Sequence, residues 1–306
     1  MKIVSLFAGA GGLDLGLIKA GHEIIWANDF DSDSCMTYRN NIGDHIIHAD
    51  IEDVDFDGIP NSDVIVGGFP CQGFSLANLL RKPEDSRNIL YKYFFKLVHQ
   101  KQPKYFLAEN VRGILSLGKG EVIKQIIRDF EKAGYRVDYK VFNTADYGVP
   151  QTRVRVIIAG TRLDLPKESN YQFPNPVVDK ENWKTIGNAL ADIPEPECHH
   201  DLENHIYSKY KVTNRNFTGH RTTDPHKPSP TILARGNGKG GVCAIQHPRN
   251  HRRMSVRESA IIQTFPKDFI FYGSMTSMYR QIGNAVPVEF AKALGVELAK
   301  LEEVLV

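Results

Sequence analysis

The sequence predicts an α/β protein in which a mostly parallel sheet carries helices on both faces and a smaller, irregular domain follows. Over the first 160 residues, short apolar runs alternate with helical patterns. Such alternation is typical of βαβ units, whose parallel strands are covered on both faces. From about residue 163 the chain becomes rich in proline and aperiodic, which indicates a linker and a second, less regular unit.

Seven apolar segments of the first part have the length and composition of buried strands. They cover residues 2–7, 23–29, 45–50, 63–68, 104–110, 136–143 and 154–160. Helical patterns lie between several of them and are clearest at 88–100 and 119–134. A further helix begins in the segment LDLGLIKAG and ends at Gly21, because glycine commonly terminates helices.

Two helical patterns follow the irregular region. The first is SVRESAIIQTF, at 255–265, and the second is the amphipathic segment at 287–305. Pro287 suits the first turn of that last helix, where its missing N–H costs no hydrogen bond. Between about 183 and 255 the chain is rich in Pro, Gly, His and Asn, so we expect a small irregular domain there.

Composition excludes several classes of protein. The chain has 306 residues, 42% of them hydrophobic, and can bury a full core. No apolar run approaches the roughly 20 residues that span a bilayer, and Asp14 interrupts the N-terminal segment that resembles a signal peptide. The cysteines are too few and too scattered for a disulfide framework. They are Cys35, Cys71, Cys198 and Cys243. We therefore expect a cytoplasmic protein.

Charge is distributed unevenly along the chain. Residues 209–257 contain eleven Lys or Arg and one acid, Asp224. The rest of the chain contains 27 basic and 35 acidic residues, a net charge of −8. A solvated charged face would explain the basic segment, but a surface that binds a polyanion explains it better.

The segment FAGAGG, at 7–12, follows the first strand and precedes a helix. Glycines there would let the backbone approach an electron-rich ligand, although many such segments are simple tight turns. The second strand ends in Asp29, which could bind ribose hydroxyls, and Phe30 could stack on an adenine. Asp50, after the third strand, could accept from the adenine amine. Because the spacing is not GxGxxG, we expect an adenosine-containing ligand without a pyrophosphate.

Two reactive side chains follow neighbouring parts of the predicted sheet. Cys71 comes after the fourth strand and Glu109 closes the fifth. Ligands of open α/β sheets bind beyond the carboxyl ends of the strands, so both side chains would face one crevice if the strands are neighbours. A buried structural thiol and a helix-capping or surface acid are the alternatives for each residue taken alone.

Basic residues follow on the seventh strand, in the segment PQTRVRV. Gln151, Arg153 and Arg155 recur at period two, so we expect them to lie on one strand and to face one side. Such a row suits a phosphate or a carbonyl oxygen, whereas a polar sheet face is the alternative.

Together these residues resemble the C5-cytosine DNA methyltransferase family of the bacterial modification type. Six segments resemble the family's motifs and follow its order. They are FAGAGG (7–12), GGFPCQGFS (67–75), AENV (108–111), QTRVR (151–155), VRESAIIQTFP (256–266) and QIGNAVP (281–287). The unmatched stretch, about 165–254, corresponds to the family's variable target-recognition region.

The resemblance implies a Rossmann-like, S-adenosylmethionine-dependent methyltransferase fold. It implies a catalytic domain at 1–175, a small target-recognition domain at 176–279 and a C-terminal segment at 280–306 that returns to the catalytic domain. Phe30 stands where the family often has tryptophan. The implied cofactor-binding residues are Phe7, Ala8, Gly9, Gly11, Gly12, Leu13, Asp29, Phe30, Asp50, Ile51, Gly68, Pro70, Leu90, Asn284 and Ala285.

The same resemblance implies a mechanism. Cys71 would add to C6 of a cytosine flipped out of the duplex, so that C5 can attack the methyl group of S-adenosylmethionine. Glu109 would hold or donate a proton at N3, and Arg155, with Arg153, would contact O2 or the phosphate. The implied DNA-binding residues are Ser75, Arg87, Gln151, Arg221, Thr231, Arg235 and Lys239. The protein would be a monomer that binds double-stranded DNA, with a restriction endonuclease acting on the same site.

Other functions remain as alternatives. A tRNA cytosine-5 methyltransferase on the same fold is the first, a catalytically inactive DNA-binding relic the second, and an oxidoreductase with an adenosine cofactor the third. Two histidine-containing groups raise the question of zinc, but neither has paired-ligand spacing, and we expect no metal. These groups are Cys198, His199 and His200 with His205, and Cys243 with His247 and His251.

Overall fold

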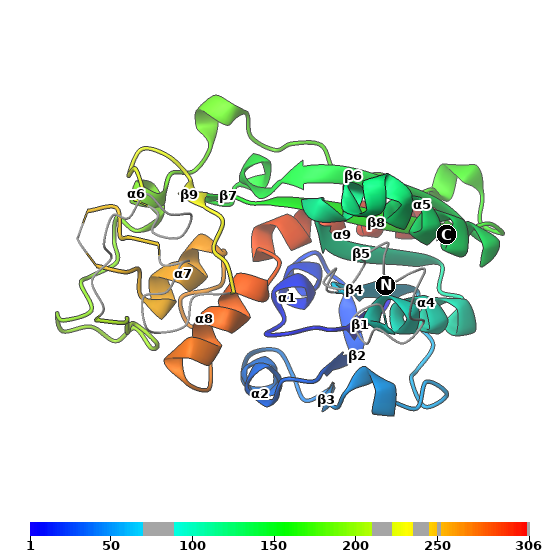
Figure 1. Cartoon of the computed structure of the whole chain (residues 1–306), viewed down its shortest axis with the longest axis horizontal. Helices are drawn as coiled ribbons and strands as arrows, with labels where there is room; N and C mark the ends of the chain where they lie inside the picture. The colour runs from blue at the N-terminus through cyan, green and yellow to red at the C-terminus, as the bar shows by residue number, and fades with distance from the viewer. Residues whose placement is uncertain (70–88, 210–221, 235–244, 250–251, 305–306) are drawn as a thin grey trace.

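A seven-stranded sheet runs through the centre of the protein (Figure 1). The computed structural model describes residues 1–69, 89–209, 222–234, 245–249 and 252–304. In the order β3-β2-β1-β4-β5-β8-β6, the first five strands are parallel and β8 is antiparallel to both its neighbours. The strands are β1 Lys2–Leu6, β2 Glu23–Asp29, β3 Ile46–His48, β4 Val64–Gly67, β5 Tyr105–Val111, β6 Tyr135–Asn143 and β8 Val154–Arg162. All seven predicted strands are confirmed.

A second, two-stranded sheet pairs β7 (Gln151–Thr152) with β9 (Ser229–Pro230) in parallel. The helices are α1 Gly12–Lys19, α2 Ser32–Asn41, α4 Ile89–Lys101, α5 Glu121–Lys132, α6 Ile186–Ala189, α7 Val256–Ile262, α8 Met275–Asn284 and α9 Val288–Val304. Short 3₁₀ helices are η1 Ile51–Asp53, η2 Arg112–Leu115, η3 Leu117–Gly120, η4 Thr144–Tyr147, η5 Lys167–Ser169 and η6 Lys180–Asn182. The described part of the chain contains no helix long and apolar enough to cross a membrane.

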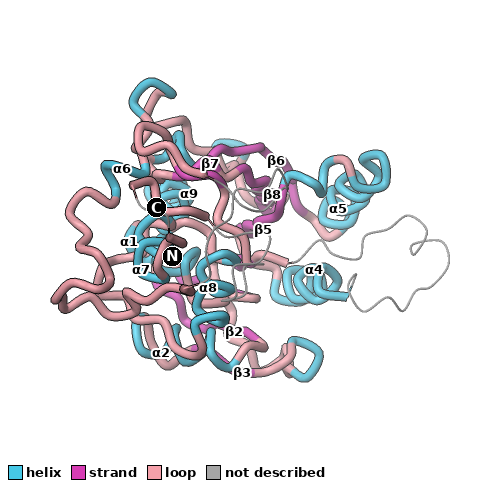
Figure 2. Tube along the Cα trace, turned by 60° about the vertical axis from the view of Figure 1, so that its left-hand side comes forward, coloured by secondary structure: helices cyan, strands magenta, loops and turns pink. Residues whose placement is uncertain are grey.

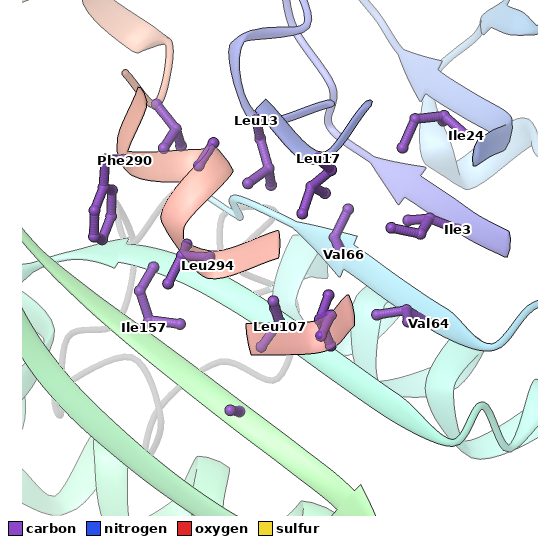
Figure 3. Close-up of a cluster of buried hydrophobic side chains, with 14 of the residues drawn as sticks. Ile3, Leu13, Leu17, Ile24, Val64, Val66, Leu107, Ile157, Phe290 and Leu294 are labelled. Atoms are coloured by element: carbon purple, nitrogen blue, oxygen red, sulfur yellow. The ribbon is translucent and has the colours of Figure 1, made fainter. Parts of the chain in front are cut away.

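Helices cover both faces of the large sheet, as the buried parallel strands require. On one face α1 and α9 pack together, and their apolar side chains meet those of β1, β4, β5 and β8 (Figure 3). The two helices approach closely because Gly16 faces α9, where an added Cβ would lie 2.3 Å from Ala291 Cβ. On the other face α4 and α5 pack side by side (Figure 2). The Phe130 ring stacks on Phe106 there, and the Phe94 ring meets Phe106 edge to face.

A third hydrophobic cluster lies in a separate lobe, to the left in Figure 1, that contains α6, α7 and α8. In Figure 2 this lobe is mostly loop between short helices, which agrees with its aperiodic sequence. Ser255 caps α7 by accepting from the Glu258 N–H, while the Glu258 carboxylate accepts from the Ser255 N–H. Ala10 and Val288 also belong to this cluster, so the lobe is packed against the glycine loop and the start of α9.

Candidate active site

The loop after β1 has a backbone that only a few residue types adopt without strain. Phe7, Gly9 and Gly11 have φ angles of 57°, 56° and 86°, in the left-handed region. A Cβ at Gly11 would lie 2.2 Å from Ile42 Cδ1, so the loop is packed tightly there. A Cβ at Gly9 would meet no atom within 4 Å. The loop therefore presents bare main chain to open space at the carboxyl edge of the sheet.

Asp29, the last residue of β2, holds this loop from the neighbouring strand. Its Oδ2 accepts from the Gly9 N–H at 2.8 Å and its Oδ1 from the Asp31 N–H at 2.9 Å. Burial raises the pKa of the Asp29 carboxyl. Each carboxylate oxygen can accept a further hydrogen bond, which is the chemistry that ribose hydroxyls require. The adjacent Phe30 is 70% exposed, so an apolar ring stands uncovered beside the loop.

The C-terminal part of the chain returns to the same loop. α8 ends at Asn284, which is exposed, and the next residues run past the start of α1. A Cβ at Gly12 would lie 2.4 Å from the Val286 carbonyl oxygen and 3.1 Å from Ala285 Cβ. Because backbone meets backbone here, only glycine allows the approach.

Glu109 and Arg155 form an ion pair where β5 and β8 lie side by side. The Arg155 Nε and Glu109 Oε1 atoms are 2.6 Å apart, and the two side chains are 10% and 13% exposed. The N–H does not point at the oxygen, so neither atom has a directed hydrogen bond. The contact is therefore one of charge between two atoms that are both shielded from solvent. Gly68, after β4, leaves room for the pair, since a Cβ there would lie 3.2 Å from Glu109 Oε2.

Asn110 connects the ends of β4 and β5. Its Nδ2 donates to the Phe69 carbonyl at 2.8 Å, and its Oδ1 accepts from the Val111 N–H at 2.9 Å. The side chain is 3% exposed. Asn110 thus fixes the chain two residues before Cys71. Sequence analysis did not single it out, although its place in the AENV segment beside Glu109 is a signal that could have done so.

The expectation that Gln151, Arg153 and Arg155 share one strand is wrong. Gln151 belongs to β7 and Arg155 to β8, and Arg153 lies between these strands. β7 pairs with β9 in the small sheet, whereas β8 pairs with β5 and β6 in the large sheet. Gln151 and Arg153 are buried, and both bond to the main chain of Ile232. Burial, and then the charge of Arg155, lower the pKa of the Arg153 guanidinium to about 9. Of the three, Arg155 makes the ion pair with Glu109.

Comparisons with known proteins identify the family. The sequence matches the C-5 cytosine-specific DNA methylases over residues 1–300. The chain belongs to this family. It is 40% identical to the Type II methyltransferase M.NgoFVII of Neisseria gonorrhoeae, over 96% of the chain and 86% of that protein. It is 38% identical to M.MthTI of Methanothermobacter thermautotrophicus, over 100% of the chain and 99% of that protein.

The fold of the methylase agrees with this membership. A solved structure of a prophage-encoded Escherichia coli protein, described as a DNA modification methyltransferase, matches with a TM-score of 0.75 at 25% identity, over 99% of both chains. The Rossmann-like fold and the S-adenosylmethionine-dependent cytosine-5 methyltransferase activity predicted from the motifs are therefore confirmed.

The remaining predicted site residues of the methylase differ in their burial and in their hydrogen bonds. Ile51 is buried, whereas Asp50 is exposed and caps η1 by accepting from the Glu52 N–H at 3.2 Å. Leu90 packs half-buried against the cluster on the α4 face, and the Thr231 hydroxyl donates to the Thr152 carbonyl. Within the described ranges, no three His, Cys, Asp or Glu side chains come together as metal ligands would. Several predictions lie outside the described residues: Pro70, Cys71, Ser75, Arg87, Arg221, Arg235 and Lys239.

Proposed function

We propose that this methylase transfers a methyl group to C5 of a cytosine flipped out of a short, specific duplex sequence, through a covalent adduct between Cys71 and C6. The observation that supports this most directly is the Glu109–Arg155 ion pair at the carboxyl edge of the sheet, where β5 is two strands from β1 and its glycine loop. Because its relatives are named Type II methyltransferases, we further propose that it is the modification enzyme of a restriction-modification system.

The residues around the glycine loop fit S-adenosylmethionine, which when bound supplies an electrophilic methyl group. Asp29 would accept from the ribose hydroxyls, and the uncovered ring of Phe30 would stack on the adenine. Asp50 would accept from the adenine amine. The bare main chain at Gly9 would let the cofactor approach, and the returning Asn284–Ala285 segment would close the other side.

Each residue of the proposed catalytic group has a separate task. The Cys71 thiolate would form a bond to C6, which turns the pyrimidine ring into an enamine whose C5 can attack the methyl carbon. Negative charge builds on the ring as sulfur adds, and Glu109 would offset it by holding a proton at N3. Arg155 would donate to O2 from its guanidinium, which the ion pair with Glu109 holds at this edge of the sheet. A base then removes the C5 proton, the C6–sulfur bond breaks and the thiolate is released.

DNA binding would use the second lobe. We propose that residues 1–175 form the catalytic domain, 176–279 the target-recognition domain, and 280–306 the segment that returns to the first. Flipping the target base costs roughly a few kcal/mol, which contacts between this lobe and the phosphates would offset. We further propose that the protein acts as a cytoplasmic monomer without a metal ion.

The proposal is tested by methyl transfer from tritiated S-adenosylmethionine to duplex DNA and, in parallel, to tRNA. We expect label in the DNA, and bisulfite sequencing of that DNA should place every methyl group within one short sequence. Cys71→Ala should abolish transfer while DNA binding by gel shift persists. Transfer to tRNA alone, or methylation that survives Cys71→Ala, would refute the proposal.

A further inference from the structure

A buried polar junction joins the catalytic sheet to two distant segments of the chain. Its members are Gln151 of β7, Arg153 between β7 and β8, and Gln263 just after α7. Their side chains are 0%, 1% and 0% exposed. We call these three the junction residues. Buried polar side chains are stable only when their hydrogen-bonding groups have partners, so the partners of these three indicate their task.

Two junction residues hold the main chain of Ile232 from both sides. The Gln151 Oε1 accepts from the Ile232 N–H at 2.9 Å, and the Arg153 Nη1 donates to the Ile232 carbonyl at 3.0 Å. The neighbouring Thr231 hydroxyl donates to the Thr152 carbonyl at 2.8 Å. Thr231, which the family resemblance implies as a DNA-binding residue, and the adjacent Ile232 are therefore fixed to the end of β7.

The junction also holds the end of α8. Arg153 Nη2 donates to the Gly283 carbonyl at 3.0 Å. Gln263 Nε2 donates to the Ile282 carbonyl at 2.6 Å and to the Ala285 carbonyl at 3.1 Å. Gln151 Nε2 donates to Gln263 Oε1 at 2.8 Å and closes the network.

The two segments held in this way also touch each other. A Cβ on Gly283 would lie 2.3 Å from the Ala234 backbone nitrogen, so the end of α8 and the chain after Ile232 meet backbone to backbone. Arg153 is two residues from Arg155, which pairs with Glu109. One short stretch of chain thus contacts the proposed recognition segment, the proposed cofactor segment and the catalytic pair.

We propose that Gln151, Arg153 and Gln263 are positioning residues that couple DNA recognition and cofactor binding to the catalytic pair, and that Arg153 does not touch the flipped base. This inference rests on the proposed function. If binding to the wrong DNA sequence displaced Ile232, Arg153 would move with it, because a buried hydrogen-bond network has few alternative arrangements. The end of α8 and the start of β8 would then move as well.

The test compares Arg153→Met and Gln151→Leu with Arg257→Met as the matched control. Arg257 is as buried as Arg153 and, like it, donates to main-chain carbonyls. It has three, those of Glu203, Pro266 and Phe269, where Arg153 has two, and it contacts none of the segments named above. For each variant we would measure hydrogen exchange without ligands, the Kd for S-adenosylmethionine, and methylation of plasmid DNA at the wild-type site and at one-base mismatches.

We expect Arg153→Met and Gln151→Leu to speed amide exchange within 229–233 and 282–286. We also expect them to reduce the ratio of cognate to mismatched methylation by about tenfold, a typical size for coupling between sites. Arg257→Met should lower stability but leave that ratio and the exchange of those segments unchanged. Loss of kcat with unchanged exchange and site choice would show that Arg153 contacts the base, and effects equal to those of Arg257→Met would show a purely structural role. Each of those results overturns the inference.

Failure of the proposed function gives a different result. If the wild-type protein transferred no methyl group to duplex DNA, the proposed function would be refuted by that measurement alone. The exchange and Kd measurements would still show whether the junction residues position the two segments, and unchanged exchange in both variants would overturn the inference on its own.

Discussion

Replacing Gly12 by alanine separates the structural and ligand-binding tasks of the glycine loop. The added Cβ would lie 2.4 Å from the Val286 carbonyl oxygen, where side-chain carbons essentially never come closer than 3.0 Å. The obstacle is backbone, so the returning segment must move away from α1. Overpacking of this kind costs about 1–3 kcal/mol. At about 2–4 °C per kcal/mol, the range for proteins of about 150–250 residues, Tm should fall by roughly 2–12 °C.

Gly9→Ala is the matched control. Its Cβ meets nothing within 4 Å, and the cost to stability is the left-handed backbone at φ 56°, about 1 kcal/mol. The methyl group would enter the space that we assign to the cofactor. Calorimetric titration should show that S-adenosylmethionine binds at least about tenfold more weakly to both variants than to the wild type. The reason is that close packing between the cofactor and the loop would be lost. Wild-type affinity in Gly9→Ala would refute the assignment of this space, and an unchanged Tm in Gly12→Ala would refute the packing argument.

Three further predictions concern single side chains. Burial raises the pKa of Asp14 from 3.8 to about 6. The contribution of Asp14 to stability is therefore fully present below about pH 4 and is lost as the pH rises through 6. In urea unfolding across this pH range, Asp14→Asn should remove up to about 3 kcal/mol of that pH dependence. Phe30→Ala should weaken S-adenosylmethionine binding by about tenfold and Phe30→Trp should preserve it, with unchanged Tm in both because the ring is 70% exposed; equal affinities of both variants and wild type would exclude stacking. Arg155→Met should lower kcat by about 10²–10³ while the KM for DNA changes little, and a large KM effect at normal kcat would point to DNA binding instead.

Much of the large domain could be predicted because its signals are local. Strands buried on both faces appear as short apolar runs, and a glycine loop interrupts them where the backbone must turn. α2 was not delimited, because its buried face is partly polar: Ser34 and Thr37 are buried beside Cys35 and Tyr38. Thr37 donates to Gln281 Oε1, and Asn41 bonds to Ile270 through both its amide atoms. Such a helix has a weak apolar period, and the partners of its polar residues lie more than 200 residues away.

The separation of β7 from β8 illustrates a second limit. The segment QTRVR has the period of a single strand, and nothing within it marks Arg153 as the point where the chain leaves one sheet for the other. That point is set by the pairing of Gln151 with Ser229. Partners at such distance in sequence are invisible to period and propensity, which describe a strand but not the sheet it joins.

The basic segment at 209–257 shows why charge counts overstate a DNA-binding surface. Three of its eleven basic residues, Arg252, Arg253 and Arg257, are 8%, 4% and 0% exposed. Arg252 pairs with Glu258 at 2.7 Å, and Arg253 stacks on the Tyr279 ring at 4.1 Å. Because buried cations that already have protein partners cannot release counterions from DNA, phosphate binding must rest on the other basic residues of the segment. The three buried arginines instead stabilise the lobe on which the other basic residues lie. One stretch of sequence therefore supplies both the interior of this lobe and its proposed DNA-binding surface.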